Sequence, residues 1–423
     1  MAGRQATGDD MRQLISPLLA TTVLCGCVTS DIRPQPKVQA VQAVQQIDSE
    51  ELLDVGIRIF DPGVPADISD TEALAKKRIF PDLRRAEARW MPVKLRSTLE
   101  STSQWGAVRV IPDGAEFQDV IVTGKILEST GRKLALEISA RDAQGRVWLD
   151  KFRAEAIADL GSYKTDAAIK ARDPFENVYA TIANALLAVR ERLSPAERRE
   201  IRRVADMRFA ADIAPQAASG YLTKDAAGLV RLSRLPAEND RLMARVASMR
   251  ERDHGVIDTI DGYHGNFYEN LSLSYGQFRR MSFDEIEKEE RARASARTRM
   301  ALGAATVLAS VLAPSPCSGN SYACENLESV ARTAGAAGGV AAIISGYKKF
   351  ADARQHAEAL AELADSFSGE ARTQVVEVEG RTLRLTGTAE EQYREWRRLL
   401  AELYRVETGA ELPSPAAPDQ PKQ

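Results

Sequence analysis

Apolar and polar residues alternate along the first third of the chain in a way that predicts a small α/β domain. Val55, Ile57 and Ile59 alternate with polar or small residues and stop at the turn Asp61-Pro62-Gly63, which indicates a strand. A helix is expected over residues 82–103, where Pro92 should kink the helix or mark its real start. The same alternation predicts four antiparallel strands, over residues 108–111, 120–127, 134–140 and 147–154.

The pattern becomes helical from about residue 173. Capping boxes that begin at Asp173, Ser194 and Ser282 predict three helix starts, the first two with proline at the first helical position. Between the last two boxes, apolar residues recur every three or four positions over residues 236–280. This spacing suits a long helix with a coiled-coil-like seam, which Asp253 interrupts.

Residues 282–368 predict two antiparallel helices with a charged base and an apolar tip. The first arm is densely charged and becomes small and apolar over residues 300–313, and the second arm reverses this order. Gly335, Gly338 and Gly339 belong to series of small residues spaced by four, which let helix backbones approach closely. Each apolar arm, about 14 to 17 residues, is too short to cross a bilayer. The tip is therefore expected to be bundle core, a shallow membrane insertion or an oligomer contact.

The whole chain is expected to be an α+β protein: a small antiparallel α/β meander domain followed by a mainly helical domain with a long helical hairpin. A last amphipathic helix should bury Tyr393, Trp396, Leu400 and Tyr404. The expected segments are a signal peptide (1–26), a lipidated cysteine and flexible tether (27–48), the meander domain (49–165), a helical domain (173–280), the hairpin (282–368), a short β-hairpin with an amphipathic helix (372–406) and a disordered tail (409–423).

The segment Leu24-Cys25-Gly26-Cys27 closes a short apolar run behind Met11 and Arg12. It resembles the lipobox of bacterial lipoprotein precursors, in which signal peptidase II cuts before the cysteine that carries the lipid. The resemblance implies a lipid on Cys27, removal of residues 1–26 as a signal peptide, and export from the cytoplasm. Met11 is a second candidate for the first residue of this signal peptide. The alternatives are an ordinary secretory signal and a buried helix.

Two cysteines remain after the lipobox, Cys317 and Cys324, and they lie in one turn-rich segment. Export to an oxidising compartment predicts a disulfide bond between them. The alternative is a metal site with two thiolate ligands, but the three histidines, His254, His264 and His356, are distant in sequence. We therefore expect neither a metal nor a cofactor.

Charge and motifs argue against several function classes. The formal net charge is −3 and the Arg-rich runs alternate with Glu, which is typical of solvated helix faces rather than of nucleic-acid binding. The sequence has no GxSxG, P-loop or HExxH motif, so no catalytic residues and no enzyme activity are expected. His254 and His264 could share a helix face without forming a metal site. The aromatic residues between 263 and 278 are expected to be bundle core rather than a partner-binding face.

The order of strand, helix and meander resembles in outline the small α/β domains of periplasmic lipoproteins. The strand from Asp119 to Ile126 and the turn Asp142-Ala143-Gln144-Gly145 carry the likeness. The curli-secretion lipoprotein family and the amino-terminal domain of TolB-like proteins are examples. The likeness implies a fold and transfers no functional residue.

These observations favour a lipid-anchored cell-envelope protein that acts as a non-catalytic scaffold or accessory subunit of an envelope assembly or transport system. Its expected partners are the membrane, through the lipid, and another envelope protein. Val28 stands where an inner-membrane retention aspartate would follow the lipidated cysteine, so the periplasmic face of the outer membrane is expected. The alternatives are a membrane-active, oligomeric pore-type protein that uses the glycine-rich hairpin, and an envelope hydrolase with an unrecognised site.

Overall fold

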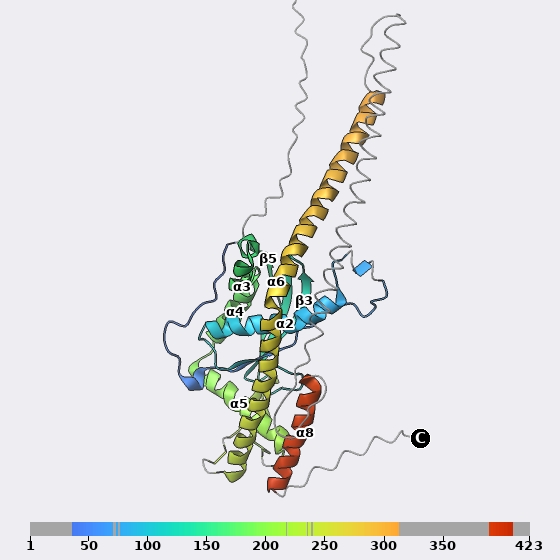
Figure 1. Cartoon of the computed structure of the whole chain (residues 1–423). Helices are drawn as coiled ribbons and strands as arrows, with labels where there is room; N and C mark the ends of the chain where they lie inside the picture. Colours follow the sequence, from blue (N-terminus) through green and yellow to red (C-terminus); the bar gives the residue numbers. More distant parts are fainter. Residues whose placement is uncertain are drawn as a thin grey trace, which may run out of the picture. The chain divides into compact units, whose positions relative to one another are not determined.

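The computed structural model of the chain (Figure 1) describes residues 36–70, 73–74, 77–216, 218–234, 236–237, 240–312 and 389–408. These residues belong to one compact unit. Five strands form one sheet and helices pack around it, which confirms the α+β class. Cys27, Cys317, Cys324, Gly335, Gly338, Gly339, the second arm of the predicted helical hairpin and the predicted β-hairpin near residue 380 lie outside the described residues.

The sheet has the strand order β2-β1-β3-β4-β5 and is mixed rather than antiparallel. Its strands are β1 (Val55–Arg58), β2 (Val108–Ile111), β3 (Val120–Ser129), β4 (Lys133–Asp142) and β5 (Val147–Ile157). β1 lies between β2 and β3 and runs parallel to both, whereas β3, β4 and β5 form the predicted antiparallel meander. The prediction of a purely antiparallel domain was wrong because alternation locates a strand without giving its direction.

Helix α2 (Pro81–Ser101) connects β1 to β2 and explains why these two strands are parallel. A strand, a crossover helix and a second strand of the same sheet form a parallel pair, since a tight turn cannot join strands that run in one direction. The helix begins at Pro81, whose missing N–H costs nothing at the first helical position, and it continues through Pro92. Of the two alternatives for Pro92, a kink or the real start of the helix, the second is therefore wrong.

Three helices follow the sheet: α3 (Asp166–Ala171), α4 (Glu176–Arg190) and α5 (Pro195–Ile213). The capping box at Ser194 is confirmed, because its hydroxyl accepts from the Glu197 N–H and the Glu197 side chain accepts from the Ser194 N–H. The box predicted at Asp173 is not formed. Asp173 instead accepts from the Phe175 N–H in a turn before α4, which starts at Glu176.

Helix α6 (Arg241–Leu312) is continuous over 72 residues. The helix start predicted at Ser282 was wrong: this residue lies inside α6, and its hydroxyl accepts from the Gly131 N–H in the turn between β3 and β4 at 3.1 Å. A Cβ atom on Gly131 would lie 2.2 Å from the Arg279 carbonyl oxygen and 2.3 Å from the Phe283 nitrogen. Only glycine therefore permits this close contact between the turn and α6.

Helix α6 packs on both the sheet and the other helices. It contacts β2, α2, α3, α5 and the final helix α8 (Ala389–Thr408). The four aromatic and apolar residues predicted on one face of α8 contact the protein core, and Tyr393, Leu400 and Tyr404 are buried. The helices expected to form a separate domain after residue 165 thus pack directly against the sheet, as the α4 contact with β5 also shows.

A two-stranded hairpin that the sequence did not reveal lies between α5 and α6. It consists of β6 (Leu222–Lys224) and β7 (Val230–Leu232), paired antiparallel. Each strand has three residues, too few for alternation to be recognised. The Val230 N–H donates to the Gln144 carbonyl oxygen at 2.9 Å, so the hairpin is attached to the turn between β4 and β5.

The chain that precedes the short helix η1 (Ser49–Glu51) lies along α4, although it falls within the segment predicted as a flexible tether. The Asn177 side chain accepts from the Val38 N–H at 3.0 Å and donates to the Pro36 carbonyl at 3.0 Å. Two helical turns further along α4, Asn184 accepts from the Val41 N–H at 2.9 Å and donates to the Gln39 carbonyl at 2.9 Å. Two amides seven residues apart on α4 thus hold this chain in place.

Candidate binding pocket

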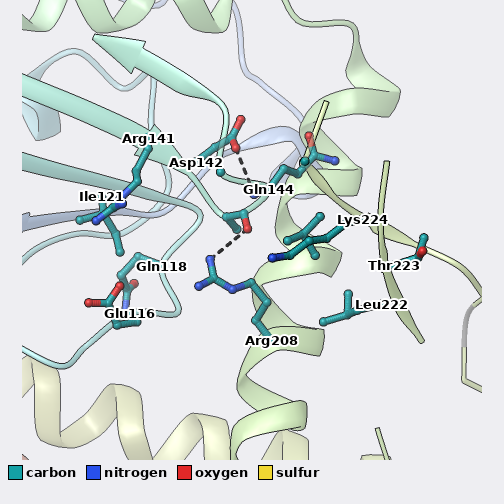
Figure 2. A pocket seen from close by; sticks show the side chains of 14 residues that line it. Glu116, Gln118, Ile121, Arg141, Asp142, Gln144, Arg208, Leu222, Thr223 and Lys224 are labelled. Carbon is teal, nitrogen blue, oxygen red and sulfur yellow. Dashed lines mark hydrogen bonds between the residues drawn. The ribbon is translucent and has the colours of Figure 1, made fainter. Parts of the chain in front are cut away.

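A cavity of about 550 Å³ lies where the β4–β5 turn, α5 and the β6–β7 hairpin meet (Figure 2). Such a volume is within the range of small-molecule sites. Its walls come from four segments that are distant in sequence, and they consist of Glu116, Gln118, Ile121, Arg141, Asp142, Ala143, Gln144, Gly145, Arg208, Leu222, Thr223, Lys224, Gly228 and Val230.

Three cationic side chains line this pocket: Arg141 at the end of β4, Arg208 on α5 and Lys224 on β6. Figure 2 shows Arg208 and Lys224 extending toward the same space, across from Glu116. Arg208 donates to the Ala143 carbonyl oxygen at 3.0 Å, and Arg141 and Lys224 are exposed. Within the described residues, none of the three has a carboxylate within 4.0 Å.

The two carboxylates of the pocket, in contrast, have partners within the protein. Glu116 forms an ion pair with Arg58. Asp142 is buried and accepts from Trp148 Nε1 at 3.0 Å and from the Gln144 and Arg146 N–H groups at 3.0 and 2.9 Å. Burial raises the pKa of Asp142, and the Trp148 hydrogen bond opposes that rise. The charge that remains available to a ligand is therefore positive.

The Gln144 side chain is a polar group of the pocket wall that has no hydrogen-bond partner among the described residues. It is completely buried, and neither the amide oxygen nor the amide nitrogen has a hydrogen-bond partner in the described part of the chain. Buried amides normally have partners, and leaving one without costs about 1–3 kcal/mol. Both amide atoms are enclosed by protein, so this group lies inside the pocket wall and not on its surface. Ile121, Leu222 and Val230 make other parts of the wall apolar.

A second polar centre surrounds the buried Arg279 of α6. Its guanidinium carbon lies 4.0 Å from the centre of the Tyr275 ring, 4.9 Å from Trp90 and 5.0 Å from Phe175. Its Nη1 atom donates to Asp173 at 2.9 Å. Arg279 is enclosed by residues of α2, of α6 and of the turn before α4, so its ion pair and cation–π contacts join these three segments.

Two buried aspartates tie other elements together. Asp253, which interrupts the apolar seam of α6, accepts from the Tyr393 hydroxyl at 3.1 Å and from Trp396 Nε1 at 3.2 Å, and thereby joins α8 to α6. Asp119 accepts from the Asp54 N–H at 2.8 Å, just before β1 and β3 begin. Burial raises the pKa of Asp119 to about 7, and the nearby Asp54 carboxylate contributes to the rise.

The histidine and aromatic residues of α6 that the sequence singled out pack within the fold. Burial, with Arg250 and Arg109 nearby, lowers the pKa of His254 to about 4, so this imidazole is neutral at pH 7. Among the residues that the structure describes, no group of three histidine, cysteine or acidic residues could hold a metal ion. Tyr275 and Phe278 are buried, and Tyr268 stacks on Trp90 with ring centres 4.7 Å apart, as expected for core aromatics.

The pocket residues were missed in the sequence because they come from separate segments and form no motif. One signal was present: Gln144 belongs to the turn Asp142-Ala143-Gln144-Gly145, which was noted only as a turn.

In the described residues, no helix combines the length and apolarity that crossing a membrane requires. No family model, curated protein or solved structure matches the chain.

Proposed function

We propose that the chain is a lipid-anchored cell-envelope protein that acts as a non-catalytic scaffold, carried on the periplasmic face of the outer membrane by a lipid on Cys27. The lipobox-like segment at Leu24 to Cys27 supports the anchor. The length of α6 supports the scaffold role, because this single helix connects the sheet with the small, apolar segment that ends at Leu312.

The docked chain along α4 limits how far the folded part could stand from the membrane. Nine residue steps separate Cys27 from Pro36, whose carbonyl oxygen is held by Asn177. Even fully extended, these residues reach only about 30 Å, at roughly 3.3–3.6 Å per residue. An anchored protein would therefore present its α4 side close to the lipid surface.

Helix α6 offers the reach that a scaffold needs. At 1.5 Å per residue, 72 residues extend about 108 Å. A compact domain of about 200 residues has a diameter of roughly 45 Å. A rigid element more than twice that size suits a protein that holds one envelope component at a distance from another, and we place the partner contact on the part of α6 after residue 290.

The lipid anchor is tested by replacing Cys27 with alanine. Because signal peptidase II requires a cysteine at its cut site, we expect Cys27→Ala to abolish acyl labelling and to leave an unprocessed precursor. The matched control is Cys25→Ala, which removes a cysteine two positions earlier and should be labelled normally. Normal labelling of Cys27→Ala would contradict the anchor, and loss of labelling only in Cys25→Ala would move the lipid to that residue.

The scaffold role is tested by site-specific photocrosslinking in intact cells. A photoreactive residue at the exposed position 297 of α6 should capture one dominant envelope protein. The same residue at the exposed position 150 of β5, on the sheet, should not capture that protein. Equal capture from both positions would argue against a partner on α6, and capture of only a second copy of the chain would favour the oligomeric, membrane-active alternative.

A further inference from the structure

We propose that the pocket beside the β4–β5 turn binds the phosphate group of a small organic ligand. The inference concerns the folded part of the chain and does not depend on the lipid anchor. It rests on three observations about one cavity: cations without an acidic partner, carboxylates that are paired or hydrogen-bonded within the protein, and a guanidinium already held in place by a backbone carbonyl.

The cations of this pocket differ from most others in the described chain. Arg58, Arg146 and Arg231, which lie near the pocket, all form ion pairs with acidic residues. Arg141, Arg208 and Lys224 do not, although they come from three elements and line the same cavity of about 550 Å³. Like charges brought together repel one another, so their gathering is explained most simply by an anion that lies between them.

Phosphate suits these donors better than a single carboxylate. Two guanidinium groups can each make paired hydrogen bonds to phosphate oxygens, and an ammonium group adds a third positive charge. The Arg208 Nη1 atom is already fixed by the Ala143 carbonyl, so this guanidinium is positioned before a ligand arrives.

The cavity is larger than a phosphate ion, and Ile121, Leu222 and Val230 make part of its wall apolar. The ligand should therefore carry an organic group next to its phosphate. Both a soluble phosphate ester and the headgroup of a phospholipid have this chemistry. The two sources are separated by probes that dissolve as monomers: glycerol 3-phosphate for the ester and dihexanoyl phosphatidylglycerol for the headgroup.

The test is calorimetric titration of the purified full chain with each probe, with glycerol as the uncharged comparison. We expect at least one phosphate probe to bind, with an affinity that falls as salt rises, and glycerol not to bind. The double variant Arg141→Gln/Lys224→Gln should lose about 10-fold or more in affinity, since both side chains are exposed and each removes one charged contact. The matched control Arg192→Gln/Arg203→Gln removes two exposed cations that do not line the pocket, and it should bind like the original chain.

Gln144→Met replaces an enclosed amide by an apolar group of similar size, so the melting temperature should stay equal or rise. Affinity for the phosphate probe should stay the same, because this amide lies inside the pocket wall. Tighter binding of glycerol 3-phosphate would identify a soluble ester, and tighter binding of the phosphatidylglycerol a headgroup. Binding of neither probe, or equal affinities of both double variants, would overturn the proposal.

Discussion

Replacing Arg279 with methionine is expected to lower the free energy of unfolding by about 4 kcal/mol. The substitution keeps most of the side-chain volume but removes the charge that pairs with Asp173 and that contacts the rings of Trp90, Phe175 and Tyr275. The two charged side chains are 2% and 5% exposed, so the remaining carboxylate would stay buried without its partner. Urea denaturation followed by circular dichroism measures the change.

The neighbouring residue provides a matched control. Arg280 also pairs with an aspartate, Asp166, but their side chains are 35% and 57% exposed. Arg280→Met should cost about 0.5 kcal/mol or less, as exposed ion pairs usually do. The double variant Arg279→Met/Asp173→Asn should be more stable than Arg279→Met alone, because it removes the isolated buried charge. Equal losses in the variants of Arg279 and Arg280 would contradict the structural role of the buried pair.

Asp119→Asn is expected to stabilise the protein in a pH-dependent way. The folded state raises the pKa of Asp119 from 3.8 to about 7, chiefly by burial. Well below pH 3.8 the carboxyl is protonated in both the folded and the unfolded states, so it adds no pH dependence. As pH rises from 4 to 7, the unfolded state loses this proton first and stability falls, and above pH 7 the loss is complete.

The asparagine variant should escape this loss, because its amide oxygen can still accept from the Asp54 N–H. Its free energy of unfolding should nearly match that of the original chain at pH 4 and exceed it by about 4 kcal/mol at pH 8. Denaturation at pH 4, 6 and 8 measures the difference. Asp150→Asn, on the exposed surface of β5, is the control and should give a difference that does not change with pH. A constant difference for Asp119→Asn as well would show that this carboxyl is not the group responsible.

Local patterns in the sequence located the strands of the five-stranded sheet and most helices, but not how they are joined. The strands of the meander were predicted because β4 and β5 bury alternate residues, which leaves a period of two. The parallel position of β1 depends on contacts between distant segments, which no local period records. The continuity of α6 was missed because a short capping motif can occur inside a helix, and tertiary contacts of Ser282 with Gly131 outweigh it.

Some polar positions in the sequence could be explained only once the fold was known. Asp253 was recognised as a break in the apolar seam of α6, and the structure shows that the break is where α8 attaches through Tyr393 and Trp396. The pocket could not be foreseen, since Arg141, Arg208 and Lys224 are brought together by three different elements. Their residue types are common on any surface, and only the fold shows that they line one cavity.

The contact of α6 with β2 also prevents the sheet from pairing with a strand of a second molecule. β2 is an edge strand, and the outward N–H of Val110 donates to the Asp261 carboxylate of α6 at 2.7 Å, while Arg109 pairs with Asp258. An uncovered edge can add a strand from another molecule and start aggregation. Here the long helix occupies that edge with side-chain acceptors, so a strand from a second chain finds no free donor at Val110. Any change that lifts α6 from β2 would expose this edge before the interior of the sheet.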